Sequence, residues 1–330
     1  MKFGERQTAG RAGISVSRAR LTLLFLLLAT TGLLAGAVYS QALYKYRGDN
    51  GEWIYSDRAP QTDSNFEVRD LPKGMSKPAV NIFDESLNGD FYIIARNEFH
   101  APVQVILGLD WLDNLDFPPA EKQLRWVVPP RSSEILLRLP QLDEDVPGNA
   151  GYRYVALPGD PESVHAPDEL YRAPFAVANS YPITQAFPTG ITHQTPDSYY
   201  AVDVTMPIGT DIYAARGGTV FEVASTNFRG GIDPDRDLPS ANLIRILHDD
   251  GTYAIYAHLN WNTIRVQPGD TVVRGEYIAD SGNTGFSSGP HLHFVVIRNK
   301  GLRLESVPVV FEGQNGSAVV PTTGDNLIAY

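Results

Sequence analysis

Short runs of largely alternating apolar and polar residues, separated by glycine and proline, fill the C-terminal half of this sequence. They include DIYAA at 211–215, NLIRILH at 242–248, TYAIYAHL at 252–259 and HLHFVVIR at 291–298. A period of two residues is that of a β-strand, whose successive side chains point to opposite faces. The 29 glycines and 24 prolines among the 330 residues interrupt the longer periodic segments that helices need. We therefore expect an all-β fold of antiparallel strands joined by short connections.

Two of the seven histidines lie one residue apart in the run GPHLHF, residues 289–294. On a strand, His291 and His293 share one face, while Leu292 and Phe294 point to the other. Two neighbouring imidazoles suggest a metal site. The chain contains no cysteine, so a metal here would be held by histidine and carboxylate ligands, a combination that suits zinc.

The N-terminus has the pattern of an export signal. Five basic residues precede an apolar run from Leu21 to Val38, and the small residues Ser40 and Ala42 follow it. This order is typical of a secretory signal that is cleaved after export. The run is also nearly long enough to cross a membrane. Residues 1–42 are therefore either a signal peptide or an N-terminal membrane anchor, and both alternatives predict an exported protein.

The charge of the exported part limits its partners. The whole chain has a formal net charge of −11, although its first 42 residues are net basic. The remainder is therefore more acidic than the chain as a whole. Binding to nucleic acid or to an anionic membrane surface needs basic patches. We therefore expect no nucleic-acid partner.

Two further modules are expected before the C-terminal half. Residues 43–72 contain two aromatic runs around the turn Asp49-Asn50-Gly51, which predicts a small β-hairpin module. This module resembles a short domain of unknown function that follows bacterial signal peptides. Residues 85–145 contain the runs FYIIARNEF, PVQVILGLDWL and EILLRL, which predict a small immunoglobulin-like β-sandwich that acts as a spacer. The stretch LPGDPESVHAPDEL indicates a linker within residues 146–180.

Five blocks of the C-terminal region occur in a distinctive order. They are His193 with Asp203, then GTDIYAARGGTV, HDDGTYAIYAHL, VQPGDTVVRG and GNTGFSSGPHLHF. In these blocks, residues 181–312 resemble the lysostaphin-type (LytM-like) zinc metallopeptidases, which are peptidoglycan endopeptidases of bacterial cell walls. The resemblance implies a compact lysostaphin-like antiparallel β-sandwich with an open groove. Residues 313–330 would then be a C-terminal tail.

The resemblance also implies the residues of the site. His193, Asp203 and His293 would bind one Zn²⁺ ion, and His258 and His291 would stand beside it as catalytic residues. Three nitrogen and oxygen ligands leave the fourth position of a catalytic zinc open for water. In the commonest form of the family, the first histidine and the aspartate lie four positions apart in the sequence, whereas His193 and Asp203 lie ten positions apart.

Other polar groups have weaker claims to the site. Asp197 is a nearer carboxylate than Asp203, but it lies in a predicted turn, and regular elements hold ligands in place better than loops do. The acidic run DPDRD at 233–237 begins as some calcium loops do, but it lacks their later glycine and glutamate. This favours a solvated insertion at the rim of the groove. Further residues expected to line the groove are Tyr256, Asn283 and Ser287.

By this resemblance the protein is an exported zinc metallo-endopeptidase that hydrolyses peptide cross-links of bacterial peptidoglycan by attack of zinc-activated water. The signal and the longer spacing indicate a Gram-negative periplasm, and hence D-alanyl-diaminopimelate cross-links. One alternative is a catalytically silent scaffold or activator of other cell-wall hydrolases. The presence of all five site residues argues against it. The other is a wall-binding spacer with a structural zinc, which would need a fourth protein ligand.

Overall fold

The computed structural model describes residues 78–117, 123–301 and 303–330, together with four strands nearer the N-terminus. The chain divides into two units. One is Gln7–Lys73, and the other joins Met1–Arg6 to Gly74–Tyr330. The apolar run at 21–38, interpreted as a signal or an anchor, lies outside the described residues. Within the described part of the chain, no helix has the length and apolar character needed to cross a membrane.

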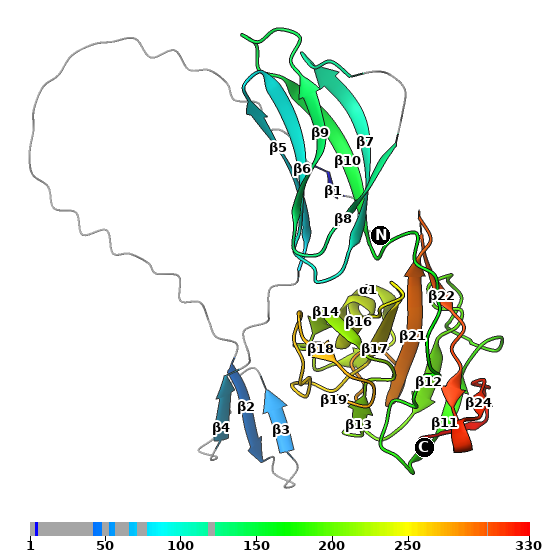
Figure 1. The fold of residues 1–330 in the computed structure, drawn as a ribbon. Coiled ribbons are helices and arrows are strands. Elements are labelled where there is room, and N and C mark those ends of the chain that lie inside the picture. Colours follow the sequence, from blue (N-terminus) through cyan, green and yellow to red (C-terminus); the bar gives the residue numbers. More distant parts are fainter. Residues whose placement is uncertain are drawn as a thin grey trace, which may run out of the picture. The chain divides into compact units, whose positions relative to one another are not determined.

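The described strands of the smaller unit form one antiparallel sheet in the order β3-β2-β4 (Figure 1). β2 (Ala42–Arg47) pairs with β3 (Trp53–Ser56) on one side and with β4 (Phe66–Asp70) on the other. The first two are the strands expected from the aromatic runs. β4 was not expected from the sequence, because its alternation of apolar and polar residues is short and includes only two apolar residues, Phe66 and Val68.

Residues 78–117 and 123–158, together with β1 near the N-terminus, form a sandwich of two antiparallel sheets, in the orders β5-β6-β9 and β1-β10-β7-β8 (Figure 1). Phe91, Ile93 and Ala95 alternate along β6 into the core between the sheets, where they pack with Val105 and Leu107 of β7. The strands are β1 (Gly4–Glu5), β5 (Val80–Leu87), β6 (Asp90–Asn97), β7 (Val103–Asp113), β8 (Leu124–Val128), β9 (Ser133–Pro140) and β10 (Asn149–Pro158).

Strand β10 occupies residues that the sequence analysis assigned to a linker. It pairs with β7 along its whole length, with a bulge between Gly151 and Tyr152. A Cβ atom on Gly151 would lie 2.2 Å from Nε1 of Trp111, so glycine lets the indole lie against this strand. The glycine and the bulge interrupt the alternation. The sequence pattern alone therefore does not reveal β10.

The larger domain, after Pro158, is built on one antiparallel sheet in the order β18-β14-β16-β17-β21-β12-β11-β25 (Figure 1). In addition, β22 pairs with the C-terminal half of β21. The strands of this sheet are β11 (Ser180–Gln185), β12 (Val202–Thr205), β14 (Gly218–Ala224), β16 (Leu243–Leu247), β17 (Tyr253–Ala257), β18 (Thr271–Val272), β21 (His291–Asn299), β22 (Leu304–Val307) and β25 (Asn326–Ile328). β25 lies within the residues expected to be a tail.

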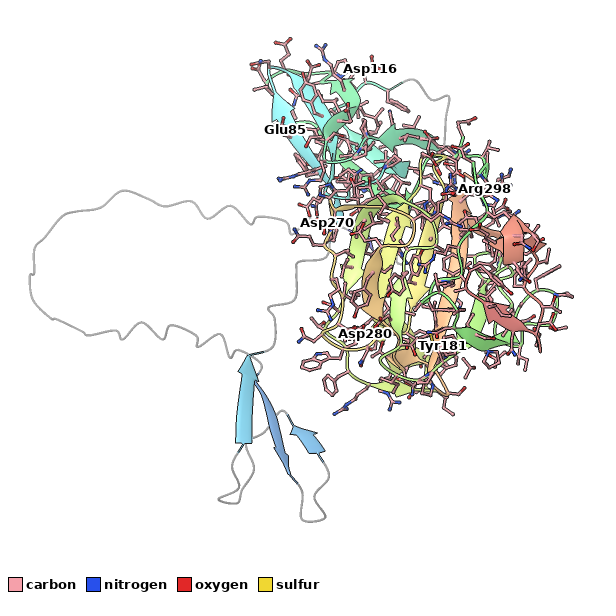
Figure 2. All side chains as sticks on the ribbon, turned by 60° about the horizontal axis from the view of Figure 1, so that its bottom comes forward. Glu85, Asp116, Tyr181, Asp270, Asp280 and Arg298 are labelled. Carbon is pink, nitrogen blue, oxygen red and sulfur yellow. The ribbon has the colours of Figure 1, made fainter. Side chains whose placement is uncertain are left out.

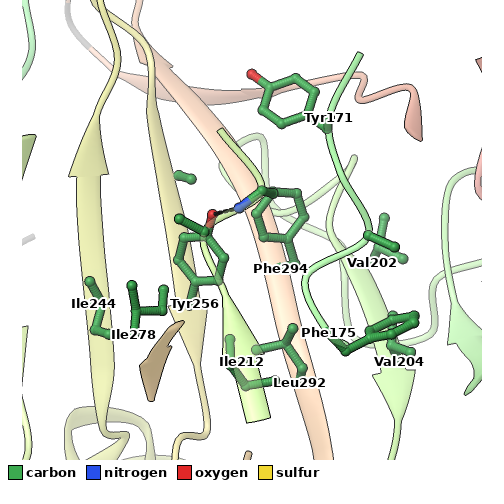
Figure 3. Packing of buried hydrophobic residues seen from close by; sticks show 14 of the residues in the cluster. Tyr171, Phe175, Val202, Val204, Ile212, Ile244, Tyr256, Ile278, Leu292 and Phe294 are labelled. Atoms are coloured by element: carbon green, nitrogen blue, oxygen red, sulfur yellow. Dashed lines mark hydrogen bonds between the residues drawn. The ribbon is translucent and has the colours of Figure 1, made fainter. Parts of the chain in front are cut away.

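A second layer covers one face of the large sheet. It contains β13 (Asp211–Tyr213) paired with β19 (Tyr277–Asp280). Ile212 and Ile278 point from these strands into a core shared with Ile244, Tyr256 and Phe294 of the large sheet (Figure 3). All five side chains are fully buried. Burying a large apolar side chain contributes about 1.5–3 kcal/mol relative to leaving it exposed, so this core holds the central strands in place.

The position of Tyr256 differs from expectation. Tyr256 was expected to line the groove, but it is fully buried in the core, and its hydroxyl oxygen accepts a hydrogen bond from the backbone N–H of Ala215 at 2.7 Å. Alternation along β17 explains the result, because Tyr256 faces the second layer. Tyr256 is therefore a core residue.

The remaining described elements are short. Within the acidic run, Asp233 caps the helix α1 by accepting hydrogen bonds from the backbone N–H groups of Asp235 and Arg236, and Asp237 pairs with Arg236. These contacts fold the insertion, in which Asp237 is buried and residues 233–236 are exposed. The short elements are β15 (Gly230–Gly231), α1 (Pro234–Asp237), η1 (Leu238–Ser240), β20 (Gly285–Phe286), β23 (Phe311–Glu312), η2 (Gln314–Gly316) and β24 (Ala318–Val319).

Acidic side chains lie on both domains. Glu85 and Asp116 lie on the sandwich, while Asp270 and Asp280 lie on the larger domain (Figure 2). This distribution agrees with the acidic composition of the chain.

The buried residue His248, which lies away from the candidate site, makes the stability of the fold depend on pH. His248 is buried, and one ring nitrogen, Nδ1, lies 2.8 Å from the carbonyl oxygen of Gly217. Burial lowers the pKa of His248 to about 4. The unfolded chain, with a histidine pKa of about 6.5, therefore binds more protons than the folded chain between pH 4 and 6.5. The free energy of unfolding should fall as pH falls through this window, by up to about 1.4 kcal/mol per pH unit for this group.

Denaturant unfolding in the presence of a chelator, at several pH values from 4.5 to 7, measures this slope. The variant His248→Gln should show a shallower slope than the wild-type protein. Equal slopes in the two proteins would contradict the prediction.

Candidate metal centre

The register of the central strands brings the candidate residues together. Asp203 of β12 is the direct partner of His293 of β21, and Thr205 is the partner of His291. On the other side of β21, Ala257 of β17 pairs with His293, so His258 follows at the end of β17. Side chains directly opposite each other on one sheet face lie within about 5.5 Å. Three neighbouring strands therefore position these groups.

His193, Asp203 and His293 form one compact group. Their ligating atoms all lie within 4.8 Å of one another. Asp203 Oδ1 lies 2.8 Å from His293 Nδ1, and Asp203 Oδ2 lies 3.2 Å from His193 Nε2. His193 and Asp203 are buried, although His193 lies on a loop and not on a strand. The structure thus joins the three residues that the sequence analysis assigned as ligands, despite the long separation of the first two.

The alternative carboxylate, Asp197, is exposed and is not part of this group. It lies in the loop that connects His193 to β12, where the hydroxyl group of Ser198 bonds to Thr195. The loop leads away from the site and returns with Asp203 on its strand.

The site favours the charged form of its carboxylate. Burial alone would raise the pKa of Asp203, but hydrogen bonds from His193 and His293, together with the nearby charges of His293 and His291, outweigh it and lower the pKa below its usual range. A carboxylate that stays charged, together with imidazole nitrogens in their neutral form, supplies the ligands that a divalent cation needs. The group therefore has the charge and the donor atoms of a zinc site.

His258 and His291 lie beside the group, with their rings 4.6 Å apart. His258 Nδ1 lies 2.7 Å from the carbonyl oxygen of Thr284, and His291 Nδ1 lies 2.8 Å from that of Gly289. A carbonyl oxygen only accepts, so each Nδ1 donates and each Nε2 is left as the acceptor. Enclosure of the ring, followed by the charges of His291 and His293, lowers the pKa of His258 to about 3. His258 also has a φ of 61°, in the left-handed region.

The loop that precedes β21 supports His291. Ser287 Oγ lies 3.2 Å from His291 Nδ1 and donates to Asn283 Oδ1 at 2.6 Å. The backbone N–H of Ser287 donates to the carbonyl of Gly231, two residues before the acidic insertion, at 2.9 Å, and β15 pairs with β20. Ser287, which was expected to line the groove, is buried and contacts His291 instead.

A cavity of about 440 Å³ opens beside the group. Asp203 and His291 form part of its wall. Hydroxyl groups and backbone line it, and Ile191 and Pro290 add apolar surface. The other residues lining it are Thr184, Gln185, Thr192, Thr205, Ser288 and Gly289. Gln185 was not identified from the sequence. Its amide donates to Asp203 Oδ2 at 2.6 Å, and only the pairing of β11 with β12 reveals that contact.

Comparison with known proteins identifies the domain that carries this site. The family model of Peptidase family M23 matches residues 197–305. The chain therefore carries a peptidase family M23 domain. The resemblance to lysostaphin-type peptidases is thereby confirmed. The matched range contains Asp203, His258, His291 and His293, whereas His193 lies just before it.

Individual relatives are similar to this chain over different lengths. Glycyl-glycine endopeptidase ALE-1 of Staphylococcus capitis is 35% identical over 114 residues, which cover 34% of this chain and 27% of ALE-1. Peptidoglycan DD-endopeptidase ShyB of Vibrio cholerae is 28% identical over 239 residues, which cover 66% of this chain and 52% of ShyB. A catalytic-domain variant of the prophage-encoded M23 protein EnpA of Enterococcus faecalis is 26% identical, covering 41% of this chain and 92% of that one, with a TM-score of 0.31. The chain thus spans at most about half the length of these two curated relatives.

The geometry predicts which histidine of the HLH pair binds the metal. The variant His293→Ala should not retain stoichiometric zinc after dialysis, because two remaining ligands hold the ion poorly. The variant His291→Ala is the matched control and should keep its zinc, since His291 is not one of the three residues whose ligating atoms form the compact group. Elemental analysis of the purified proteins measures the zinc content. Zinc retained by His293→Ala and lost by His291→Ala would reverse the assignment.

Proposed function

We propose that this protein is a zinc metallo-endopeptidase that hydrolyses peptide cross-links of bacterial peptidoglycan. The observation that carries the proposal is the compact group of His193, Asp203 and His293, which adjoins and overlaps the M23 match. His258 and His291 stand beside the group, and a cavity opens next to it. A metal site, groups that transfer protons and room for a substrate are the parts that a metallopeptidase needs.

Zinc fits the three proposed ligands. Two imidazoles and a carboxylate are a donor set that catalytic zinc takes, with a further position left open. The charged form of Asp203 is the one that binds a cation. A zinc ion held here would supply Lewis acidity, which activates water near neutral pH and polarises the scissile carbonyl group.

We assign the proton steps to the two remaining histidines. His258 has a lowered pKa and keeps a neutral ring, so its Nε2 accepts a hydrogen bond from the attacking water and orients it. His291 lines the cavity. Its Nε2 takes the proton that the water gives up and passes it to the leaving amine, while the carbonyl of Gly289 holds the ring through Nδ1. General acid–base transfer of this kind contributes about 10²–10⁴-fold to the rate.

The proposed substrate is the D-alanyl-diaminopimelate cross-link of a Gram-negative wall. ShyB, whose name is that of a peptidoglycan DD-endopeptidase, aligns well beyond residues 197–305, whereas ALE-1, named for glycyl-glycine bonds, aligns over 114 residues. The protein would act in the periplasm, exported by residues 1–42, which are either cleaved or retained as an inner-membrane tether. We do not propose a silent scaffold, because all five site residues are present and gathered together.

Digestion of defined cross-linked muropeptides tests this function. The zinc-loaded protein should cleave D-alanyl-diaminopimelate dimers, with products identified by mass, and should leave pentaglycine bridges largely intact. Cleavage of pentaglycine alone would overturn the choice of bond, and no cleavage of either substrate would overturn the proposed activity.

Replacement of the proposed proton carrier tests the mechanism. His291→Ala should lose about 10²-fold or more in kcat while keeping its zinc. His100→Ala, in the sandwich domain, should cleave as the wild-type protein does. Full turnover by His291→Ala would remove His291 from the mechanism.

A further inference from the structure

Gln185 lies directly opposite Asp203. It is the last residue of β11, and the register of β11 with β12 pairs Gln185 with Asp203. Directly paired residues on neighbouring antiparallel strands project to the same face of the sheet. The Gln185 side chain therefore stands beside the carboxylate of the metal group and lines the same cavity.

The hydrogen bonds of Gln185 fix the direction of its amide. Oε1 accepts from the backbone N–H groups of Ile191 and Thr192, at 2.6 and 2.9 Å. Two N–H donors require an oxygen, so the amide nitrogen must occupy the other end. That nitrogen donates to Asp203 Oδ2 at 2.6 Å. The Gln185 side chain thus bonds at one end to Asp203, a proposed metal ligand. At the other end it bonds to Ile191 and Thr192, which directly precede His193.

His193 needs such support more than the other ligands do. It lies on a loop, ten residues before Asp203 and outside any strand. A histidine that binds a metal normally donates its second ring nitrogen to an acceptor, which fixes the ring. In the described part of the chain, no protein group bonds to the buried Nδ1 of His193. The position of the His193 ring therefore depends on the loop. The hydrogen bonds of Gln185 connect that loop to the sheet.

We propose that Gln185 is a positioning residue of the metal centre, which holds the Asp203 carboxylate and the His193 loop at the distance that one ion requires. The inference rests on the proposed zinc site, but not on the substrate. It explains how this chain accommodates the long separation between His193 and Asp203, because the amide supplies the link that a short connection would otherwise provide.

Zinc affinity, measured by competition with a chromophoric chelator, tests the inference without any substrate. Gln185→Met keeps an unbranched side chain of similar length but removes both sets of hydrogen bonds. It should weaken zinc binding by about 10–100-fold, the usual effect of losing a residue that supports metal ligands. Gln185→Asn keeps the amide on a side chain one methylene shorter, and should also weaken binding.

Gln194→Met is the matched control. Gln194 follows His193 on the same loop and donates to the carbonyl of Gly190 at 2.7 Å, but it does not bond to Asp203. Its replacement should change zinc affinity less than about threefold, since it supports no ligand directly. Thermal unfolding of the three metal-free variants should resemble that of the wild-type protein, which separates loss of the metal from loss of the fold.

The possible outcomes are distinct. If the Gln185→Met and Gln185→Asn variants bound zinc as tightly as the wild-type protein, this result would overturn the role of Gln185. It would leave the proposed function intact. A wild-type protein that binds zinc but cleaves no muropeptide would overturn the proposed function, while the affinity comparison would still decide the role of Gln185. A wild-type protein that binds no zinc would overturn both.

Discussion

The pairing of Asp203 with His293 across β12 and β21 is the contact on which the site depends. A shift of one residue in this register would move every side chain of one strand to the opposite face. Packing on the opposite face of the sheet fixes this register. The side chains buried in the core there are Val202, Val204, Leu292 and Phe294. Apolar packing on one side of the sheet therefore sets the distances between polar groups on the other side.

The same face of β21 serves two purposes along its length. His291 and His293 occupy its first residues, and the next residues on that face, Val295 and Ile297, join an apolar cluster with Ala101 and Phe99 of the sandwich. The site is thus the uncovered end of a strand whose other end is covered by the neighbouring domain. This arrangement leaves space for a substrate beside the histidines and excludes water from the rest of the strand.

The sequence predicted those features that follow from local periodicity. Alternation in HLHF places both histidines on one face, and the strand-like run YAVDV indicates a fixed backbone around Asp203. What local periodicity could not predict depends on contacts between distant segments. The direction of Tyr256 into the core depends on a second layer, and the role of Gln185 depends on which strand lies beside β12. The strand β10 is hidden because a glycine and a bulge interrupt its pattern.

The backbone conformation of His258 has a consequence for the stability of the fold around the site. Its φ of 61° lies in a region where a side chain crowds the backbone, and which glycine and asparagine adopt at lower cost. The turn at this residue ends β17 and brings the ring against His291. A sequence optimised for folding alone would carry glycine or asparagine at this position. Histidine at position 258 therefore lowers the stability of the fold locally. The fold tolerates this loss because most of β17 is buried.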